Sequence, residues 1–252
     1  MALLEVHNIT MKFGELLAID NVSFNIEVNT IVGLIGPNGA GKTTLFNCIS
    51  GIYRPNSGKI IFDQTNITEL SAYNVARLGA VRTFQVVRPL KEMSVFDNVL
   101  VGAFLKNKNT TKAFGIASKS IEICNLKDNQ NKKAGDLTIG DKKRLELACA
   151  LATSPKLLML DEIMAGLTTT EIKVAIEIIK NIQQNGTTLL VVEHVMEAIM
   201  PIADKIVVLD SGVKIVEGAP QEIITNETVM TAYLGKKFAT RLKKAREINR
   251  NG

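Results

Sequence analysis

Residues 34–45 read LIGPNGAGKTTL, and the glycines, Pro37 and Asn38 in this stretch interrupt a chain that is otherwise rich in Val, Ile and Leu. Residues 36–43 fit the pattern GxxxxGK[ST], with a strand-like run at 31–35 before them and a helical pattern at 44–49 after them. In such a loop the backbone N–H groups wrap around a phosphate, and the N-terminus of the following helix adds positive potential. The stretch therefore predicts a triphosphate cradle in an α/β core, in preference to an ordinary glycine-rich turn.

Two residues at the end of the cradle have specific expected roles. Lys42 reaches the β- and γ-phosphates of a nucleotide, and the hydroxyl of Thr43 is placed to bind Mg²⁺. The residues expected to contact the nucleotide are Gly36, Pro37, Asn38, Gly39, Ala40, Gly41, Lys42, Thr43 and Thr44. The cradle alone does not say what the nucleotide is used for, because kinases, GTPases and motors all contain one.

Charge is distributed unevenly along the 252 residues, whose formal net charge is +5. Residues 236–252 hold seven Lys/Arg and one acidic residue, Glu247, which leaves 23 basic and 24 acidic residues in the rest of the chain. The body is therefore near neutral, and nucleic acid is not expected as a partner. For the basic tail at 236–252, a solvated helix is favoured over a contact with anionic lipid headgroups or RNA.

The cysteines and the lack of a membrane-spanning run indicate the compartment. Cys48, Cys124 and Cys149 are odd in number, widely spaced and flanked by apolar residues, which favours reduced thiols over a disulfide framework. The sequence shows no secretory signal pattern, and no run approaches the roughly 18 apolar residues that span a bilayer. We therefore expect a cytoplasmic protein, with any membrane span provided by another polypeptide.

An α/β alternation dominates the chain after an opening group of β-branched, strand-like runs. The predicted strands lie at 3–6, 22–28, 31–35, 59–62, 157–160, 188–192 and 206–209. The last three are continuous apolar runs, typical of a parallel sheet that is buried on both faces. Apolar residues at Ile172, Ala175, Ile176 and Ile179 predict an amphipathic helix over 168–184.

The middle of the chain lacks strand-like runs. Helices are expected around 94–105 and 111–125, with exposed polar loops at 106–112 and 127–133. With the helix that follows, this segment predicts a helical insertion at about 86–152. The expected organisation is one domain at 1–235 that contains this insertion, followed by the tail at 236–252.

Two further stretches carry groups that suit nucleotide chemistry. The first, LLMLDE at 157–162, ends a predicted buried strand with two carboxylates, so that Asp161 can hold Mg²⁺ while Glu162 polarises an attacking water. The second, LTIGDKKRLELACALA at 137–152, places Gly140 at the start of a helix whose free N–H groups can receive an anion. Alone, the first is a common coincidence and the second an ordinary capped helix.

Together and in this order, the second stretch resembles the LSGGQ signature of ABC ATPases. Phe13 in MKFGEL is similar to the family's adenine-stacking aromatic, Gln85 in VRTFQ to its Q-loop glutamine, and His194 in LLVVEH to its switch histidine. AGLT at 165–168 resembles the D-loop. Taken singly, Phe13 would be interpreted as a core aromatic, Gln85 as a polar strand end and His194 as a helix cap.

The resemblance covers residues 3–235 and implies a fold and a set of site residues. The fold is an ABC-type nucleotide-binding domain of class α/β, with a mostly parallel core sheet, an N-terminal antiparallel β portion and a helical insertion. The implied catalytic residues are Glu162, His194, Lys42 and Gln85, and the implied Mg²⁺ ligands are Thr43, Gln85 and Asp161. Nucleotide contacts from a second subunit are implied for Leu137, Thr138, Ile139, Gly140 and Asp141.

The sequence departs from the family pattern at four positions. Thr138 and Ile139 replace the Ser-Gly of LSGGQ, Ile163 follows Glu162 where Pro is usual, and Thr168 ends the D-loop where Asp or Asn is usual. None of these changes removes a charged group from the chemistry. They bear on the catalytic rate and on the choice of partner.

Within the family, the stretches at 36–60, 81–102 and 231–235 resemble the ATP-binding subunit of branched-chain amino-acid importers. This resemblance implies ATP and Mg²⁺ as cofactors, and a second ABC ATPase subunit, permeases and an extracytoplasmic solute-binding protein as partners. It also implies a peripheral location on the inner face of the cell membrane. The alternatives are an ABC ATPase for urea, short amides or lipid, and a soluble ABC ATPase that serves translation or DNA maintenance.

Overall fold

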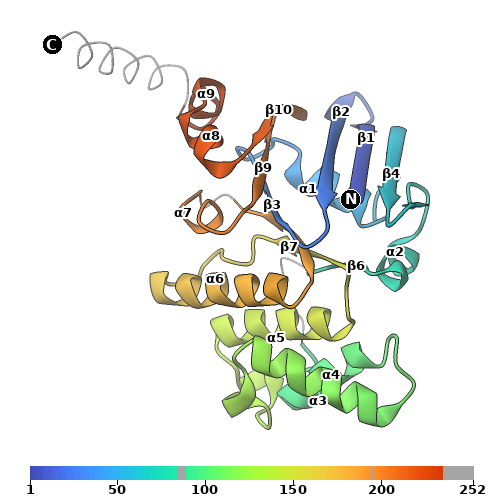
Figure 1. Cartoon of the computed structure of the whole chain (residues 1–252), viewed down its shortest axis with the longest axis vertical. Coiled ribbons are helices and arrows are strands. Elements are labelled where there is room, and N and C mark those ends of the chain that lie inside the picture. The colour runs from blue at the N-terminus through green and yellow to red at the C-terminus, as the bar shows by residue number, and fades with distance from the viewer. Residues whose placement is uncertain (84–88, 194–195, 235–252) are drawn as a thin grey trace, which may run out of the picture.

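The computed structural model describes residues 1–83, 89–193 and 196–234, which form two β-sheets and a set of helices (Figure 1). The first sheet is antiparallel, has the strand order β2-β1-β4-β5 and consists of β1 (Ala2–Phe13), β2 (Leu16–Glu27), β4 (Ser57–Phe62) and β5 (Thr65–Asn66). The second has the order β10-β9-β3-β8-β7-β6. Its strands are β3 (Ile31–Ile35), β6 (Ala80–Arg82), β7 (Leu157–Asp161), β8 (Thr188–Val192), β9 (Lys205–Asp210) and β10 (Val213–Gly218).

All neighbouring strands of the second sheet are parallel except β10, which runs antiparallel to β9. The expectation of a mostly parallel core sheet with an N-terminal antiparallel portion is therefore confirmed. Every residue of β3, β7 and β8 is buried, because helices cover one face of this sheet and the antiparallel sheet and α1 (Lys42–Ile49) cover the other. Alternate side chains of each strand enter two separate cores.

The remaining helices are α2 (Ala72–Leu78), α3 (Val95–Ala103), α4 (Thr110–Ile123), α5 (Ile139–Ala152), α6 (Thr169–Gln184), α7 (Met196–Ile199), α8 (Pro220–Thr225) and α9 (Glu227–Leu234), with short 3₁₀ turns at Lys127–Asn129 and Ala134–Asp136. In Figure 1, α3, α4 and α5 form a helical lobe at the end of the molecule opposite α9. This lobe corresponds to the expected insertion, and its helices begin and end close to the predicted ranges.

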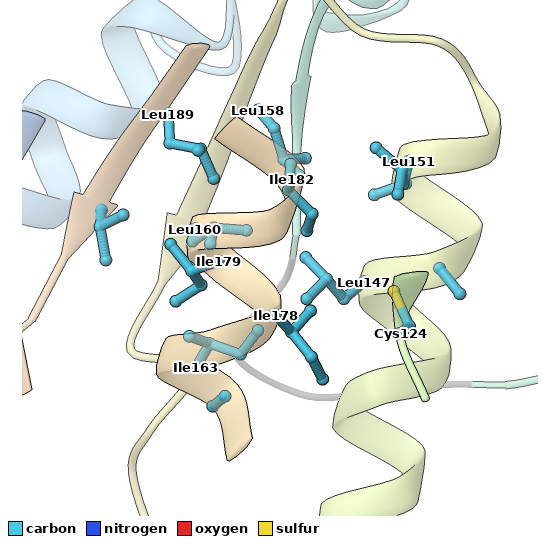
Figure 2. Close-up of a cluster of buried hydrophobic side chains, with 14 of the residues drawn as sticks. Cys124, Leu147, Leu151, Leu158, Leu160, Ile163, Ile178, Ile179, Ile182 and Leu189 are labelled. Atoms are coloured by element: carbon cyan, nitrogen blue, oxygen red, sulfur yellow. The ribbon is translucent and has the colours of Figure 1, made fainter. Parts of the chain in front are cut away.

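The contact between α5 and α6 is apolar and lies against the second sheet. Figure 2 shows Leu147 and Leu151 of α5 facing Ile178 and Ile182 of α6. The predicted apolar stripe on α6 packs on this core: Ala175 and Ile179 are buried, and Ile172 and Ile176 are half-buried against it. Because α6 packs against both the sheet and α5, its buried surface is rotated toward residues 178 and 182.

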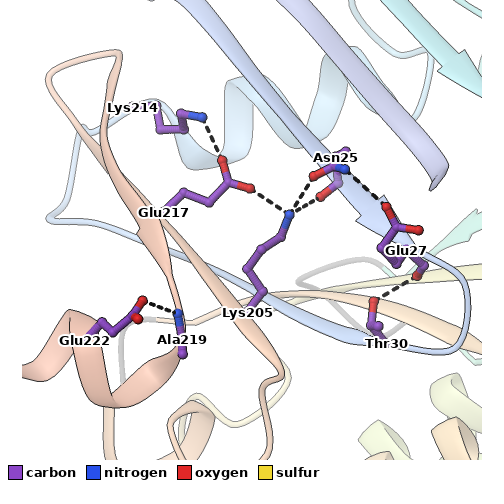
Figure 3. A network of polar contacts seen from close by, with 8 residues as sticks. All are labelled: Asn25, Glu27, Thr30, Lys205, Lys214, Glu217, Ala219 and Glu222. Atoms are coloured by element: carbon purple, nitrogen blue, oxygen red, sulfur yellow. Dashed lines mark hydrogen bonds and ion pairs between the residues drawn. The ribbon is translucent and has the colours of Figure 1, made fainter. Parts of the chain in front are cut away.

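A polar network joins β2 of the antiparallel sheet to β9 and β10 of the second sheet (Figure 3). The Lys205 ammonium of β9 donates to the backbone carbonyl of Asn25 in β2 at 2.6 Å and to Glu217 Oε1 of β10 at 2.6 Å. Lys214 donates to the other oxygen of Glu217 at 2.7 Å. The carboxylate is thus held between two ammonium groups of its own sheet, and Lys205 connects that sheet to β2 of the antiparallel one.

Strand order also decides where chemistry can gather. β8 lies between β3 and β7, so the carboxyl ends of these three parallel strands meet at one edge of the sheet. Residues 36–43 follow β3, Asp161 and Glu162 come at the end of β7, and Glu193 follows β8. Segments that are more than 100 residues apart in the sequence therefore share one edge.

Candidate nucleotide site

The loop between β3 and α1 is held closely against the rest of the domain. Gly41 has φ +95°, and a β-carbon at this position would lie 2.6 Å from the Ala18 carbonyl oxygen of β2. On the other side, the Gly212 amide of the β9–β10 turn donates to the Ala40 carbonyl at 3.1 Å. A side chain at position 41 would therefore push the loop away from β2, which accounts for glycine there.

Lys42 begins α1 and turns its ammonium back into the loop. Its Nζ donates to the carbonyl oxygens of Gly36 at 2.8 Å and Pro37 at 3.0 Å, and the residue is only 6% exposed. Burial lowers the pKa of Lys42, and the nearby carboxylates of Glu162 and Asp161 oppose that shift. The ammonium therefore lies within the curve of the loop, close to both acidic groups.

Asp161 ends β7 with its carboxylate buried. Its Oδ2 lies 3.4 Å from Arg82 Nη2 of β6. Burial raises the pKa of Asp161, Arg82 opposes the rise and Glu162 adds to it. A carboxylate oxygen here and the exposed hydroxyl of Thr43 are oxygen donors of the kind that Mg²⁺ prefers, so these residues fit the predicted metal.

Glu162 follows directly in an uncommon backbone conformation. Its φ is +49°, in the left-handed region that non-glycine residues seldom adopt, and its amide donates to the Val192 carbonyl of β8 at 2.9 Å. This turn directs Glu162 into the same cleft as the phosphate loop. The strand end therefore separates the two acidic neighbours, with Asp161 buried beside Arg82 and Glu162 at the cleft.

The cleft has a volume of about 660 Å³ and brings together Phe13, residues 38–44 and Glu162 of the predicted site, whereas the predicted contacts Gly36 and Pro37 do not line it. Phe13, at the end of β1, is 42% exposed there and makes an edge-on contact with Tyr53, with ring centroids 5.3 Å apart. The interpretation of Phe13 as a core aromatic is therefore wrong. The residues that line the cleft are Phe13, Leu16, Leu17, Ala18, Asn38, Gly39, Ala40, Gly41, Lys42, Thr43, Thr44, Glu162, Ser211 and Gly212.

Five of these lining residues were missed by sequence reasoning: Leu16, Leu17, Ala18, Ser211 and Gly212. The pair Ser211-Gly212 carries a turn signal, and it does form the β9–β10 turn. Its place beside the phosphate loop follows from the neighbouring positions of β9 and β3 in the sheet. A turn signal has no information about that neighbourhood.

The signature-like residues 137–141 lie outside this cleft. Thr138 caps α5, because its hydroxyl accepts from the Asp141 amide at 3.1 Å, and Ile139 beside it is 71% exposed. A β-carbon on Gly140 would lie 2.5 Å from Glu171 Oε1 of α6, the end of a flexible side chain that can move aside. Leu137 is buried. Gln85 and His194, two further predicted site residues, lie outside the described residues.

Comparisons with known proteins show the family of this chain. The model of the family described as ABC transporter matches residues 19–165, which is more than half of the chain. The LivG high-affinity branched-chain amino acid transport ATP-binding protein of Salmonella typhimurium is 40% identical over 250 residues, covering 93% of this chain and 98% of that protein. The corresponding BraF protein of Pseudomonas aeruginosa is 40% identical over 252 residues, again covering 93% and 98%.

Solved structures agree as well. A nucleotide-free ATP-binding cassette from an ABC transporter is 30% identical, with a TM-score of 0.82, and covers 94% of this chain and 100% of that one. The ADP conformation of an ATP-binding cassette of an ABC transporter gives a TM-score of 0.84 at 30% identity and the same coverage. The fold and the cleft thus define an ATP-binding cassette.

The chain belongs to the ABC transporter family. The predictions of an ABC-type fold and of an ABC ATPase that binds ATP are thereby confirmed. Among the described residues, none of the helices combines the length and the apolar character that a membrane span needs.

Proposed function

We propose that this chain is the ATP-hydrolysing, energy-coupling subunit of an importer for branched-chain amino acids. The observation that carries the proposal is that the phosphate loop, Phe13 and Glu162 line one cleft. It is supported by the near-full-length similarity to LivG and BraF, whose names assign them to high-affinity branched-chain amino acid transport. A cleft lined by residues that suit nucleotide binding thus occurs in a chain similar to transport ATPases.

In the proposed site, this chain supplies the groups that bind the phosphates and activate water. The loop amides and Lys42 stabilise negative charge on the β- and γ-phosphates, and Phe13 stacks on the adenine. Glu162 accepts the proton of the attacking water. Thr43, Asp161 and Gln85 would hold Mg²⁺. The bound ion would neutralise charge on the phosphate oxygens. His194 is proposed to contact the γ-phosphate.

The second half of each ATP site is proposed to come from another ATPase subunit, identical or related. Residues 137–141 of one subunit lie outside its own cleft, which suits a head-to-tail pair in which they face the partner's nucleotide. ATP then contacts both subunits and favours the closed pair, and hydrolysis removes the contact that holds the two subunits together. When the two ATPase subunits close around ATP, the helical lobe is proposed to transmit this movement to permease subunits at the inner face of the membrane. A solute-binding protein is proposed to act on the other side.

The test is to isolate the protein from its native membranes in mild detergent and identify the stoichiometrically bound polypeptides by mass spectrometry. We expect two multi-span permeases and a second ATPase subunit. The purified complex in proteoliposomes should then accumulate radiolabelled leucine with ATP when the accompanying binding protein is present. A matched complex carrying Glu162→Gln should not.

Other outcomes would overturn the proposal in distinct ways. Accumulation of urea, a short amide or a lipid in place of leucine would keep the importer and change the solute. Recovery only with ribosomes or DNA, or recovery of the ATPase alone, would exclude the transport role.

A further inference from the structure

The segment 163–165, which follows Glu162 directly, is held by a half-buried lysine on one side and a buried glutamate on the other. Glu162 itself has φ +49°, a conformation that costs free energy and persists only where the surroundings hold it. The family pattern usually has Pro after the glutamate, and Pro would fix the backbone there. This chain has Ile163, so the restraint must come from elsewhere.

Lys143, in the second turn of α5, restrains this segment from one side. Its Nζ donates to the carbonyl oxygens of Ile163 at 3.0 Å and Ala165 at 2.5 Å. The side chain crosses from α5 along a small apolar cavity of about 100 Å³ between α5 and α6, which Ile163 and Leu167 also line. A single ammonium thus bridges the signature helix and the loop after Glu162.

Glu193, after β8, restrains the same segment through the backbone amide of Met164. The Met164 amide donates to Glu193 Oε1 at 2.9 Å, and Glu193 is fully buried. Burial lowers the pKa of Lys143, while the carboxylates of Glu193, Glu146 and Glu162 oppose that shift. Lys143 therefore binds the carbonyl oxygens of residues 163 and 165, and Glu193 binds the amide of residue 164. Together these hydrogen bonds restrain the loop.

We propose that Lys143 is a positioning residue that holds Glu162 in its hydrolytic orientation and couples it to the signature helix. The proposal rests on the proposed function, in which α5 faces the nucleotide of the partner subunit. Because α5 belongs to one ATP site and Glu162 to the other, the Lys143 bridge links the two sites within one subunit.

The test compares Lys143→Met with Lys143→Arg and with a control, Lys180→Met. Lys180 is exposed on α6 and makes no side-chain hydrogen bond or ion pair among the described residues. Methionine keeps the apolar stem of Lys143 but donates no hydrogen bond, whereas arginine keeps the charge. Lys143→Gln replaces the methionine variant if that variant does not fold.

The first readout needs no activity. In nucleotide-free protein we expect Lys143→Met to speed amide hydrogen exchange in peptides that cover 162–168, and Lys180→Met to leave it unchanged. Unchanged exchange in Lys143→Met would overturn the proposal. Faster exchange over the whole chain would also overturn it, because that would show general destabilisation.

The second readout separates binding from hydrolysis. We expect Lys143→Met to bind a fluorescent ATP analogue within about 2-fold of the wild-type affinity, to lower kcat at least about 10-fold and to reduce the Hill coefficient for ATP, with Lys143→Arg restoring most of the rate. An equal fall in kcat in Lys143→Met and Lys180→Met would contradict the positioning role of Lys143. If the wild-type protein itself hydrolyses no ATP, the proposed function fails, whereas the exchange experiment still decides whether Lys143 holds the loop.

Discussion

Arg82 of β6 joins α1, which begins with Lys42, to the end of β7 at Asp161 through one guanidinium group. Nη1 donates to Asn47 Oδ1 of α1 at 2.5 Å, Nη2 lies 3.4 Å from Asp161 Oδ2, and the guanidinium carbon stands 4.7 Å from the centre of the Phe46 ring. Arg82 and Asp161 are 12% and 5% exposed. The pair is thus buried, and removing one partner leaves the other charge uncompensated.

We therefore expect Arg82→Met to lower the free energy of unfolding by about 3 kcal/mol, because the buried Asp161 carboxylate would keep only the weaker attraction of Lys42. Arg82→Lys should lose less, since it keeps a charge but not the planar group that reaches both Asn47 and Asp161. Urea denaturation followed by circular dichroism measures both variants. Equal stability of Arg82→Met and the wild type would show that the pair contributes nothing.

At the residue scale, local sequence predicted the phosphate loop well and the polar contacts around it poorly. The loop depends on consecutive residues, so its pattern and flanking elements are visible in the sequence. Arg82, in contrast, contacts residues 35 positions before it and 79 after it, and Lys143 contacts a loop 20 residues away. Such contacts depend on the packing of elements and have no local signal.

At the scale of elements, the start of α6 explains one departure from the family pattern. Thr168 is the N-cap residue, and its hydroxyl and the Glu171 side chain form a reciprocal capping box. The backbone and side-chain hydrogen bonds from Thr168 lower the pKa of Glu171. Asp and Asn, which the family uses at this position, are also strong N-cap residues, so Thr preserves the cap.

Loss of this cap should therefore be measurable. We expect Thr168→Ala to lower Tm by about 2–4 °C, because the first turn of α6 loses its hydroxyl acceptor. Thr168→Ser keeps the hydroxyl and should melt close to the wild type. Differential scanning calorimetry distinguishes the two, and an alanine variant as stable as the serine variant would exclude the capping role.

The type of most elements could be predicted, whereas their buried faces and some short strands could not. The periodicity of apolar residues predicted α6. Which of these residues are most buried depends on how α5 packs against α6, and the sequence of α6 alone does not show that. The three-residue strand β6 was missed, because Ala80–Arg82 is too short to show alternation. Its existence follows from pairing with β7.

At the scale of the whole molecule, Lys205 connects the two sheets, because its ammonium donates to Asn25 of β2 and to Glu217 of β10, which also accepts from Lys214 (Figure 3). Burial would raise the pKa of Glu217, but the hydrogen bonds and charges of the two lysines outweigh it, so the pKa is lowered. A carboxylate with a lowered pKa in the folded state stabilises the protein above its unfolded-state pKa. That stabilisation is lost as the pH falls through the folded-state value.

We therefore expect Glu217→Gln to have a lower Tm than the wild type at pH 7, since two ammonium groups lose their shared carboxylate. The difference should shrink as the pH falls through the lowered pKa of Glu217, where the wild-type carboxyl becomes protonated. Thermal unfolding of both proteins from pH 7 to pH 3 measures the effect. A difference that stays constant with pH would mean that the charge of Glu217 is not involved.

Global topology was the least accessible feature from sequence. The fold class followed from the alternation of strand-like and helical runs, but the order β3-β8-β7, which brings the phosphate loop, Glu193 and Glu162 to one edge, had no sequence signal. The family resemblance supplied an expected site and not the contacts that hold it.

The most direct test of the site is the turnover of Glu162→Gln in the purified complex, measured beside its affinity for ATP. Glutamine has the shape of glutamate but cannot accept the proton of the attacking water. We expect unchanged ATP binding and a fall in turnover of at least about 100-fold, equivalent to at least ~2.7 kcal/mol of transition-state stabilisation. Turnover close to the wild-type rate would contradict the assignment of Glu162 as the catalytic base.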